Sequence, residues 1–142
     1  MVEAVGTDAF EGCSGLSSVD LPQVNRIYTS AFSGCSNLSL LDFPMLTVLD
    51  PVVFFGCSNL NHINLPKATN IGWGIFRDCP NITSVVLSSS KPISFDYQDY
   101  STDNIDLTLH INKKNDVVGL KWKNMTWKAI SFVDDNGNPV TE

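Results

Sequence analysis

The chain has 142 residues, a net charge of −6 at pH 7, 43% hydrophobic residues and 17% charged residues. This length fits one domain with a single core, and the composition argues against disorder over most of the chain. Nine basic residues against fifteen acidic ones leave no extended basic patch, and no run of about eighteen apolar residues is present, so nucleic-acid binding and a membrane span are excluded.

The N-terminus opens in the middle of a repeating pattern. Met1 occupies the position that Gln23 occupies one period later, no polar cap precedes it, and the first residues lack the features of a signal peptide. Either the product is cytosolic, or an export segment lies upstream. We expect further repeats upstream, and an uncapped N-terminal edge at which two chains could pair as a dimer.

Residues 1–90 repeat with a period of 22 residues. Two columns carry the period most clearly: Phe10, Phe32, Phe54 and Phe76, and Cys13, Cys35, Cys57 and Cys79. The copies read AFEGCSGLSSVDLP, AFSGCSNLSLLDFP, VFFGCSNLNHINLP and IFRDCPNITSVVLS. A period of this length with L-x-x-L-x-L is typical of a leucine-rich-repeat solenoid, with one β-strand and an irregular or short helical return per turn.

Each strand is expected at the end of the copy, for example over Ser18–Leu21, with alternate side chains pointing inward and outward. The proline that follows ends the strand. The outward positions form a mixed surface of the kind on which leucine-rich repeats usually hold partners. The candidate binding residues on it are Ser18, Asp20, Leu40, Asp42, His62, Asn64, Ser84 and Val86. Trp73, in an Ile-Gly-Trp-Gly turn, is a further candidate as an exposed aromatic anchor, or else packs on the neighbouring turn.

The cysteine column predicts free, buried thiols that fill one row of the core. Neighbouring coils lie about 4.8 Å apart, within reach of a disulfide, but side chains in one column point in parallel. A zinc site is not expected, because its ligands must converge on one point. The sequence therefore predicts neither a metal nor a cofactor.

Catalysis is not expected either, so the chain is predicted not to be an enzyme. A nucleophilic thiolate needs a base within hydrogen-bond reach. His62 and His110 are the only histidines, and His62 faces outward whereas the cysteines face inward. Asp20 and Asp42 are neighbours on an open strand face, which is more often a solvated surface than a catalytic cleft.

The period ends near residue 90. Residues 91–106 read as an acidic loop with Asp96, Asp99, Asp103 and Asp106, either solvated or able to bind calcium. Residues 107–111 alternate as a half-buried edge strand. A short helix is expected over 115–121 and a last strand over 129–133. Segment 107–133 would form a small α/β cap, and 134–142 a flexible tail.

The string AFxGCSxLxxVxLP…I resembles the BspA-like leucine-rich repeats of bacterial and protozoan surface proteins, over residues 2–90. The segment LTLHINKKNDVVGLKWKNMTWKAISFVD is similar to the family's C-terminal closing segment, although Ile111-Asn112 replaces its usual Val-Pro. The resemblance implies secretion to the cell surface and adhesion to an extracellular protein, such as host matrix or another cell. The alternatives are a structural spacer that presents other domains, and carbohydrate binding through Trp73, Tyr97 and Tyr100.

Overall fold

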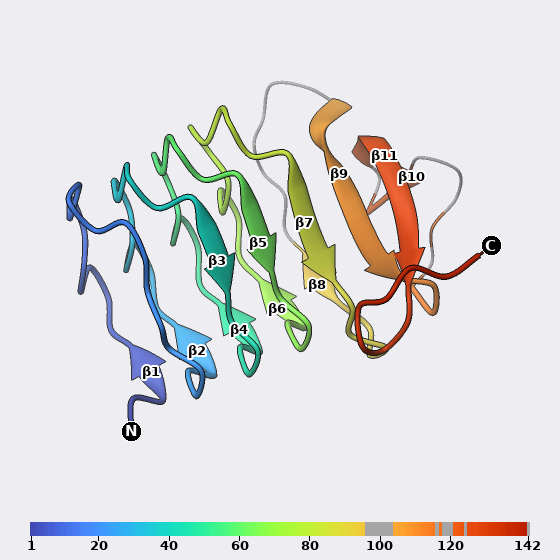
Figure 1. Ribbon diagram of the computed structural model, residues 1–142, viewed down its shortest axis with the longest axis horizontal. Helices are drawn as coiled ribbons and strands as arrows, with labels where there is room; N and C mark the ends of the chain where they lie inside the picture. Colours follow the sequence, from blue (N-terminus) through green and yellow to red (C-terminus); the bar gives the residue numbers. More distant parts are fainter. Residues whose placement is uncertain (96–103, 116, 118–120, 124, 142) are drawn as a thin grey trace.

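The computed structural model describes residues 1–95, 104–115, 117, 121–123 and 125–141. The chain winds into a β-solenoid of about five turns, whose strands form two sheets (Figure 1). None of the described residues forms a helix, and they therefore include no helix that could cross a membrane. The helical part of the predicted return and of the predicted α/β cap is wrong for these residues.

The larger sheet carries the predicted repeat strands and has the order β10-β11-β9-β7-β5-β3. Its strands pair in parallel except β10, which is antiparallel to β11. The register steps by one repeat, since Leu41 lies beside Ile63 and Ile63 beside Val85. In chain order the strands are β3 (Leu40–Asp42), β5 (His62–Asn64), β7 (Ser84–Leu87), β9 (Asn104–Asn112), β10 (Lys121–Trp122) and β11 (Met125–Val133).

A second parallel sheet forms the return side of each turn, with the order β1-β2-β4-β6-β8. Its two-residue strands are β1 (Ala4–Val5), β2 (Arg26–Ile27), β4 (Val48–Leu49), β6 (Asn70–Ile71) and β8 (Ser94–Phe95). The second residue of each strand is buried and extends one apolar column along the stack. Two residues are too short to show an alternation, so sequence reasoning predicted an irregular return here.

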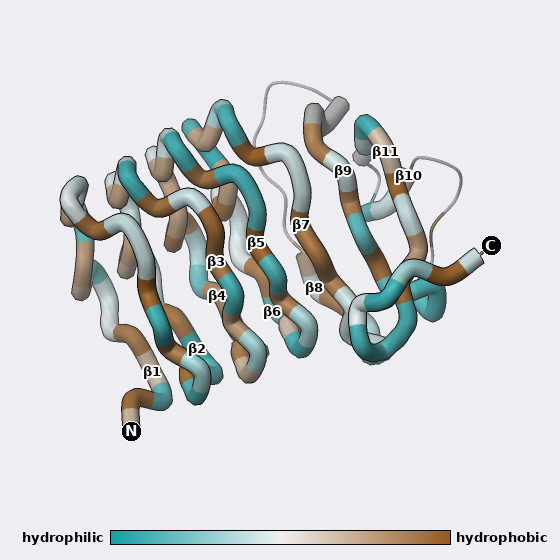
Figure 2. Tube along the Cα trace, viewed as in Figure 1, coloured by the Kyte–Doolittle hydropathy of each residue, from teal (hydrophilic) through white to brown (hydrophobic). Residues whose placement is uncertain are grey.

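The core between the sheets is built from columns that repeat along the stack. The rings of Phe10, Phe32 and Phe54 stack on one another, with centroids 5.3 and 6.0 Å apart. Offset stacking at this spacing stabilises aromatic pairs beyond the area they bury. Along the strands, hydrophobic and hydrophilic segments alternate (Figure 2), as expected where one side chain points to the core and the next to solvent.

The turns between the sheets require two left-handed residues in each repeat. One column is Asp8, Ser30, Val52 and Gly74, and the other is Gly12, Gly34, Gly56 and Asp78; all have positive φ. Glycine adopts this conformation without the Cβ clash that other residues meet, which explains why one column is mostly glycine. Val52, at φ 54°, is the residue in these two columns that fits this conformation least well, because β-branched side chains disfavour it.

Three aromatic rings close the C-terminal end of the core. Phe95 continues the buried column of the second sheet and packs on Trp122 and Trp127, with ring centroids 5.5 and 5.9 Å away. Both tryptophans are buried, and Trp127 Nε1 donates a hydrogen bond to the Trp122 carbonyl oxygen at 3.3 Å. The predicted tryptophan-containing closure is therefore present, built on strands.

Several local predictions are wrong. Ser18–Leu21 forms no strand, and the sheet ends at β3, although Val19 and Leu21 are less exposed than their neighbours. β9 begins at Asn104 instead of residue 107 and lies between β7 and β11, so it is not an edge strand. β11 likewise begins at Met125 instead of residue 129.

Other predictions fall partly on residues outside the description. Residues 96–103, which include most of the acids of the predicted loop, lie outside it, and Ser94–Phe95 within that loop is β8. The helix predicted over 115–121 covers residues 116 and 118–120, which are also outside it, and its last residue belongs to β10. Beyond β11, a turn is held by Asp134, whose carboxylate accepts hydrogen bonds from the amides of Asn136 and Asn138.

Candidate functional site

The solvent side of β3, β5, β7, β9 and β11, here called the outer strand face, carries two rows of side chains. Because paired residues of parallel strands share a face, each row can be followed from strand to strand. The first row is Leu40, His62, Ser84, Thr108 and Ala129. The second row is Asp42, Asn64, Val86, His110 and Ser131. The six strand residues predicted as binding candidates therefore lie together on one face.

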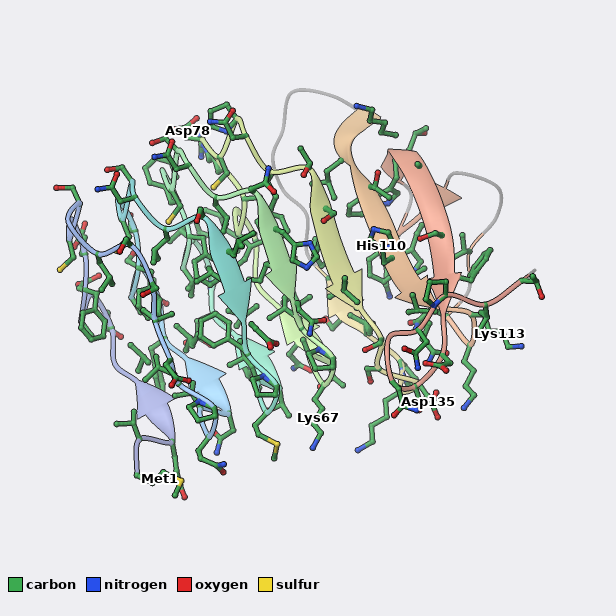
Figure 3. The ribbon with its side chains drawn as sticks, viewed as in Figure 1. Met1, Lys67, Asp78, His110, Lys113 and Asp135 are labelled. Atoms are coloured by element: carbon green, nitrogen blue, oxygen red, sulfur yellow. The ribbon has the colours of Figure 1, made fainter. Side chains whose placement is uncertain are left out.

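Sequence reasoning missed the four residues that the C-terminal strands add to these rows: Thr108, His110, Ala129 and Ser131. A signal for two of them existed, because the alternation in Leu-Thr-Leu-His-Ile points Thr108 and His110 to the same side. What the sequence did not show is that β9 pairs with β7, which aligns that side with the repeats. The label on His110 in Figure 3 marks its position on this face.

A hollow of about 530 Å³ lies at the N-terminal end of the outer strand face. It forms between β3 and β5 on one side and the first repeat on the other, because the first repeat adds no strand to the larger sheet. Five of the predicted residues line it: Asp20, Leu40, Asp42, His62 and Asn64. Of the other predicted residues of this face, Ser18 is exposed, whereas Ser84 and Val86 are partly buried on β7.

The hollow combines an apolar projection with acidic groups. Leu40 is 64% exposed, which is far more than any other aliphatic residue of the sheet face. Asn64 Nδ2 donates a hydrogen bond to Asp42 Oδ1 at 3.0 Å and holds that carboxylate in place. Asp20 adds a second acid, and none of the described lysines or arginines lines the hollow. It is therefore suited to a partner group that offers positive charge or hydrogen-bond donors next to an apolar contact.

Both histidines lie on the outer strand face, and each is held by a serine of the next strand. His62 Nδ1 is hydrogen-bonded to Ser84 Oγ, and His110 Nδ1 to Ser131 Oγ. Burial lowers the pKa of His110, and repulsion from His62 lowers it further. The rings therefore stand in fixed orientations at the centre of the face.

The cysteines are separate from this surface, as predicted. Cys35, Cys57 and Cys79 are buried thiols outside any disulfide, and their sulfur atoms donate hydrogen bonds to the carbonyl oxygens of Phe10, Phe32 and Phe54. Burial, and then repulsion from the neighbouring thiols, raises the pKa of Cys57 to about 12, so it is not a nucleophile near neutral pH. Cys13, also free, is exposed, so the prediction of burial is wrong at the first repeat.

Trp73 does not join the outer strand face. It follows β6 in the second sheet and is 38% exposed, so part of its side chain is accessible to a partner and the rest is covered by protein. Tyr97 and Tyr100, the other aromatic candidates, lie outside the described residues. Among the residues that are described, no three His, Cys, Asp or Glu side chains group in a way that could hold a metal ion.

Comparison with known proteins identifies the repeat. A family model described as BspA type leucine rich repeat region matches residues 1–104 in six copies. The fold is similar to the crystal structure of a leucine-rich repeat protein from Bacteroides ovatus, with a TM-score of 0.63 and 28% sequence identity. That match covers 78% of this chain, which spans only 28% of the Bacteroides chain. No curated protein matches the sequence.

Proposed function

Because the chain belongs to the BspA-type leucine-rich repeat family, we propose that it is a non-catalytic module that binds a protein partner through its outer strand face. Leucine-rich repeats are commonly protein-interaction modules, which supports the general class. The observation that carries the proposal is the hollow at the N-terminal end of that face, where exposed Leu40 projects beside Asp20 and Asp42.

The chemistry of the hollow favours a partner segment with a basic side chain next to an apolar one. An apolar anchor surrounded by polar groups is the arrangement in which a few residues dominate binding energy. The acids at its rim would accelerate association with a basic partner and make it sensitive to salt. The ordered hydrogen bond between Asp42 and Asn64 reduces the entropy lost when a partner docks.

The size of the face predicts weak binding by one copy. Three short strands of about 10–13 Å and two of about 30 Å, each about 4.8 Å apart, present roughly 450 Å². A stable interface uses about 800 Å² on each partner. We therefore expect useful affinity to come from avidity, through many copies on a surface or through a longer array of repeats.

We further propose that the protein acts outside the cell, as an adhesive module for host matrix or another cell surface. Family members are typically surface-associated in bacteria, which supports this location. A multivalent surface display would also supply the avidity that a face of this size needs.

The proposal is tested with the chain displayed on beads against a panel of extracellular-matrix proteins. Leu40→Ser and Asp42→Asn should each reduce attachment, because both side chains are exposed at the hollow and neither supports the core. Phe55→Ser is the control, since Phe55 is also an exposed apolar residue (36%) but lies on a turn away from the face. Equal loss in the control, or no attachment by a folded chain, would favour the structural spacer.

Carbohydrate binding through Trp73 is a second candidate, supported by the exposure of its ring. Exposed aromatic rings stack on the apolar faces of sugars, and a 38% exposed tryptophan offers such a platform. Trp73→Ala should then abolish attachment to a polysaccharide panel and leave protein attachment unchanged. Shielding of Trp73 from a soluble fluorescence quencher would contradict this candidate.

A further inference from the structure

A second hollow lies at a different edge of the molecule, where the turns follow the strands of the larger sheet. Its volume is about 370 Å³, within the usual range for small-molecule sites. Five of the nine residues that line it carry hydroxyl groups, namely Thr47, Thr69 and Ser88–Ser90, and the others are Pro66, Lys67, Lys91 and Asp135. In Figure 3, Lys67 and Asp135 lie along the same lower edge of the molecule, away from His110.

The charge of this hollow is opposite to that of the acidic hollow on the outer strand face. Within the described residues, the hydrogen-bond partner of Lys67 Nζ is the sulfur of Met45, a weak acceptor at 3.3 Å. The Lys91 ammonium group has no partner among the residues that the structure describes. In a chain with a net charge of −6, two cations without strong partners that line one hollow mark a site for an anionic group.

Asp135, the one carboxylate among the described residues that line the hollow, already has cationic and polar neighbours. Asp135 Oδ1 accepts a hydrogen bond from Asn112 Nδ2 at 2.8 Å, and its carboxylate forms an ion pair with Lys114 at 3.3 Å. These contacts lower the pKa of Asp135, so it stays ionised and its remaining lone pairs can accept hydrogen bonds from a ligand. A bare oxyanion has no hydroxyl to donate to it, whereas a sugar does.

One hydroxyl group beside the hollow is out of reach of a ligand. Ser88 is 1% exposed, and its Oγ has no hydrogen-bond partner within the described part of the chain. The turn at Gly137 covers it from one side, since a Cβ at Gly137 would lie 3.7 Å from Ser88 Oγ. A ligand in the hollow would therefore contact the residues around Ser88 and not its hydroxyl group.

We propose that this hollow binds an acidic sugar residue, with its carboxylate or sulfate held by Lys67 and Lys91 and its hydroxyl groups held by Ser89, Ser90 and Asp135. The cations select the charge of the ligand, and the hydroxyl-rich lining with one carboxylate selects a polyhydroxylated ring over a simple oxyanion. The site is separate from the outer strand face, so either proposal can fail without the other.

The test is isothermal titration of the full chain with four probes: a sulfated heparin disaccharide, a galacturonate disaccharide, a neutral disaccharide and inorganic sulfate. At least one of the two disaccharides should bind, and should shift the amide resonances of Ser88–Lys91. Lys67→Gln and Lys91→Gln should each weaken that binding by roughly tenfold or more, as expected for loss of a hydrogen bond to a charged group. Lys123→Gln is the matched control, because Lys123 is exposed in the turn between β10 and β11 and should leave the affinity unchanged.

Ser90→Ala separates a ligand role from a structural one. It should weaken sugar binding but leave the melting temperature unchanged, because Ser90 lines the hollow and its side chain is exposed. Three results would overturn the proposal: no sugar binding at millimolar concentration, inorganic sulfate bound as tightly as the sugars, or affinity that neither lysine variant changes. Equal binding of a neutral disaccharide would overturn it as well, since the lysines would then have no role.

Discussion

The repeated turns and the C-terminal strands contribute to the same sheet, but they are positioned by different means. Between repeats, paired residues are 22 positions apart, as for Leu41 and Ile63. Between β7 and β9 the spacing is 24, as for Val85 and Leu109. Between β9 and β11 it changes at a register shift from 22, as for Ile105 and Trp127, to 21, as for Leu109 and Ile130. The sheet and its outer face continue although the period does not. Because the outer strand face is built by strand pairing, it can extend beyond the residues whose sequence shows the 22-residue period.

The largest effect is expected from removing the aromatic closure at the C-terminal end. Trp127→Ala should lower the free energy of unfolding by about 3–5 kcal/mol, because the ring is 1% exposed and packs on Phe95 and Trp122. Phe54→Ala, in the middle of the repeats, is the matched variant and should cost a similar amount. Chemical denaturation should show one transition for both. Separate transitions would mean that the C-terminal strands form an independent unit.

The next largest loss of stability is expected where neighbouring turns of the repeat region pack closely on one another. A Cβ at Gly72 would lie 2.5 Å from the backbone nitrogen of Pro51 in the adjacent turn. Gly72→Ala should therefore cost about 1–3 kcal/mol, as overpacking usually does. A Cβ at Gly15 would meet nothing within 4 Å, so Gly15→Ala serves as the control in the same thermal melts. A stable Gly72→Ala variant would show that adjacent turns can move apart.

One copy of the repeat, the one that contains Val52, fits the left-handed turn position poorly, and replacing this residue should raise stability. Val52→Asn should stabilise the chain by about 1 kcal/mol, because asparagine tolerates the left-handed conformation that valine disfavours. Val48→Asn, at a partly buried valine in an ordinary strand, should destabilise it instead. Thermal melts of the two variants should move in opposite directions, and a loss of stability in both would contradict the strain at Val52.

The smallest expected effect is a pH dependence that arises in the C-terminal strands. Burial lowers the pKa of His110 below its ordinary value of 6.5, so the unfolded chain takes up that proton first as the pH falls. The contribution of neutral His110 to stability is therefore complete above pH 6.5 and decreases as the pH falls toward the lowered pKa. In melts between pH 7 and 5, His110→Gln should show a shallower decline than the unaltered chain.

The loss of stability caused by protonation of His110 can be separated from the effect of Asp134 and Asp135 in the turn after β11. The pKa values of Asp134 and Asp135 are lowered below 3.8 by their hydrogen bonds, so their contribution to stability is present above that pH and lost only below it. An unchanged slope in His110→Gln above pH 5 would show that His110 is not the group responsible.

The positions of individual residues in the repeat region could be predicted because the sequence there is periodic. The buried columns of phenylalanine and cysteine and the six strand residues of the outer face all followed from the 22-residue step and alternation. The first repeat departs from this prediction: Phe10 is 38% exposed and Cys13 is exposed, whereas Phe32 and Cys35 are fully buried. Burial here depends on having a neighbour on both sides, which a local pattern does not encode.

The rest of the site depended on pairings and turns that no local pattern specifies. His110 joins the outer strand face because β9 pairs with β7 at a new spacing. The hollow beside Asp20 arises because Ser18–Leu21 adds no strand, although its sequence matches the later copies. Ser88 and Asp135 are 47 positions apart and meet only because the turn after β11 returns to the end of β7.

Amide hydrogen exchange across the boundary between β7 and β9 tests the central claim most directly, namely that the repeats and the C-terminal strands form one sheet with one outer face. Thr108 N donates to the Thr83 carbonyl oxygen at 2.8 Å across this boundary, as Thr83 N donates to Asn61 at 2.9 Å within the repeats. The account predicts similar protection factors for the two amides, with both reporting the same opening. Rapid exchange at Thr108, with Thr83 protected, would contradict it.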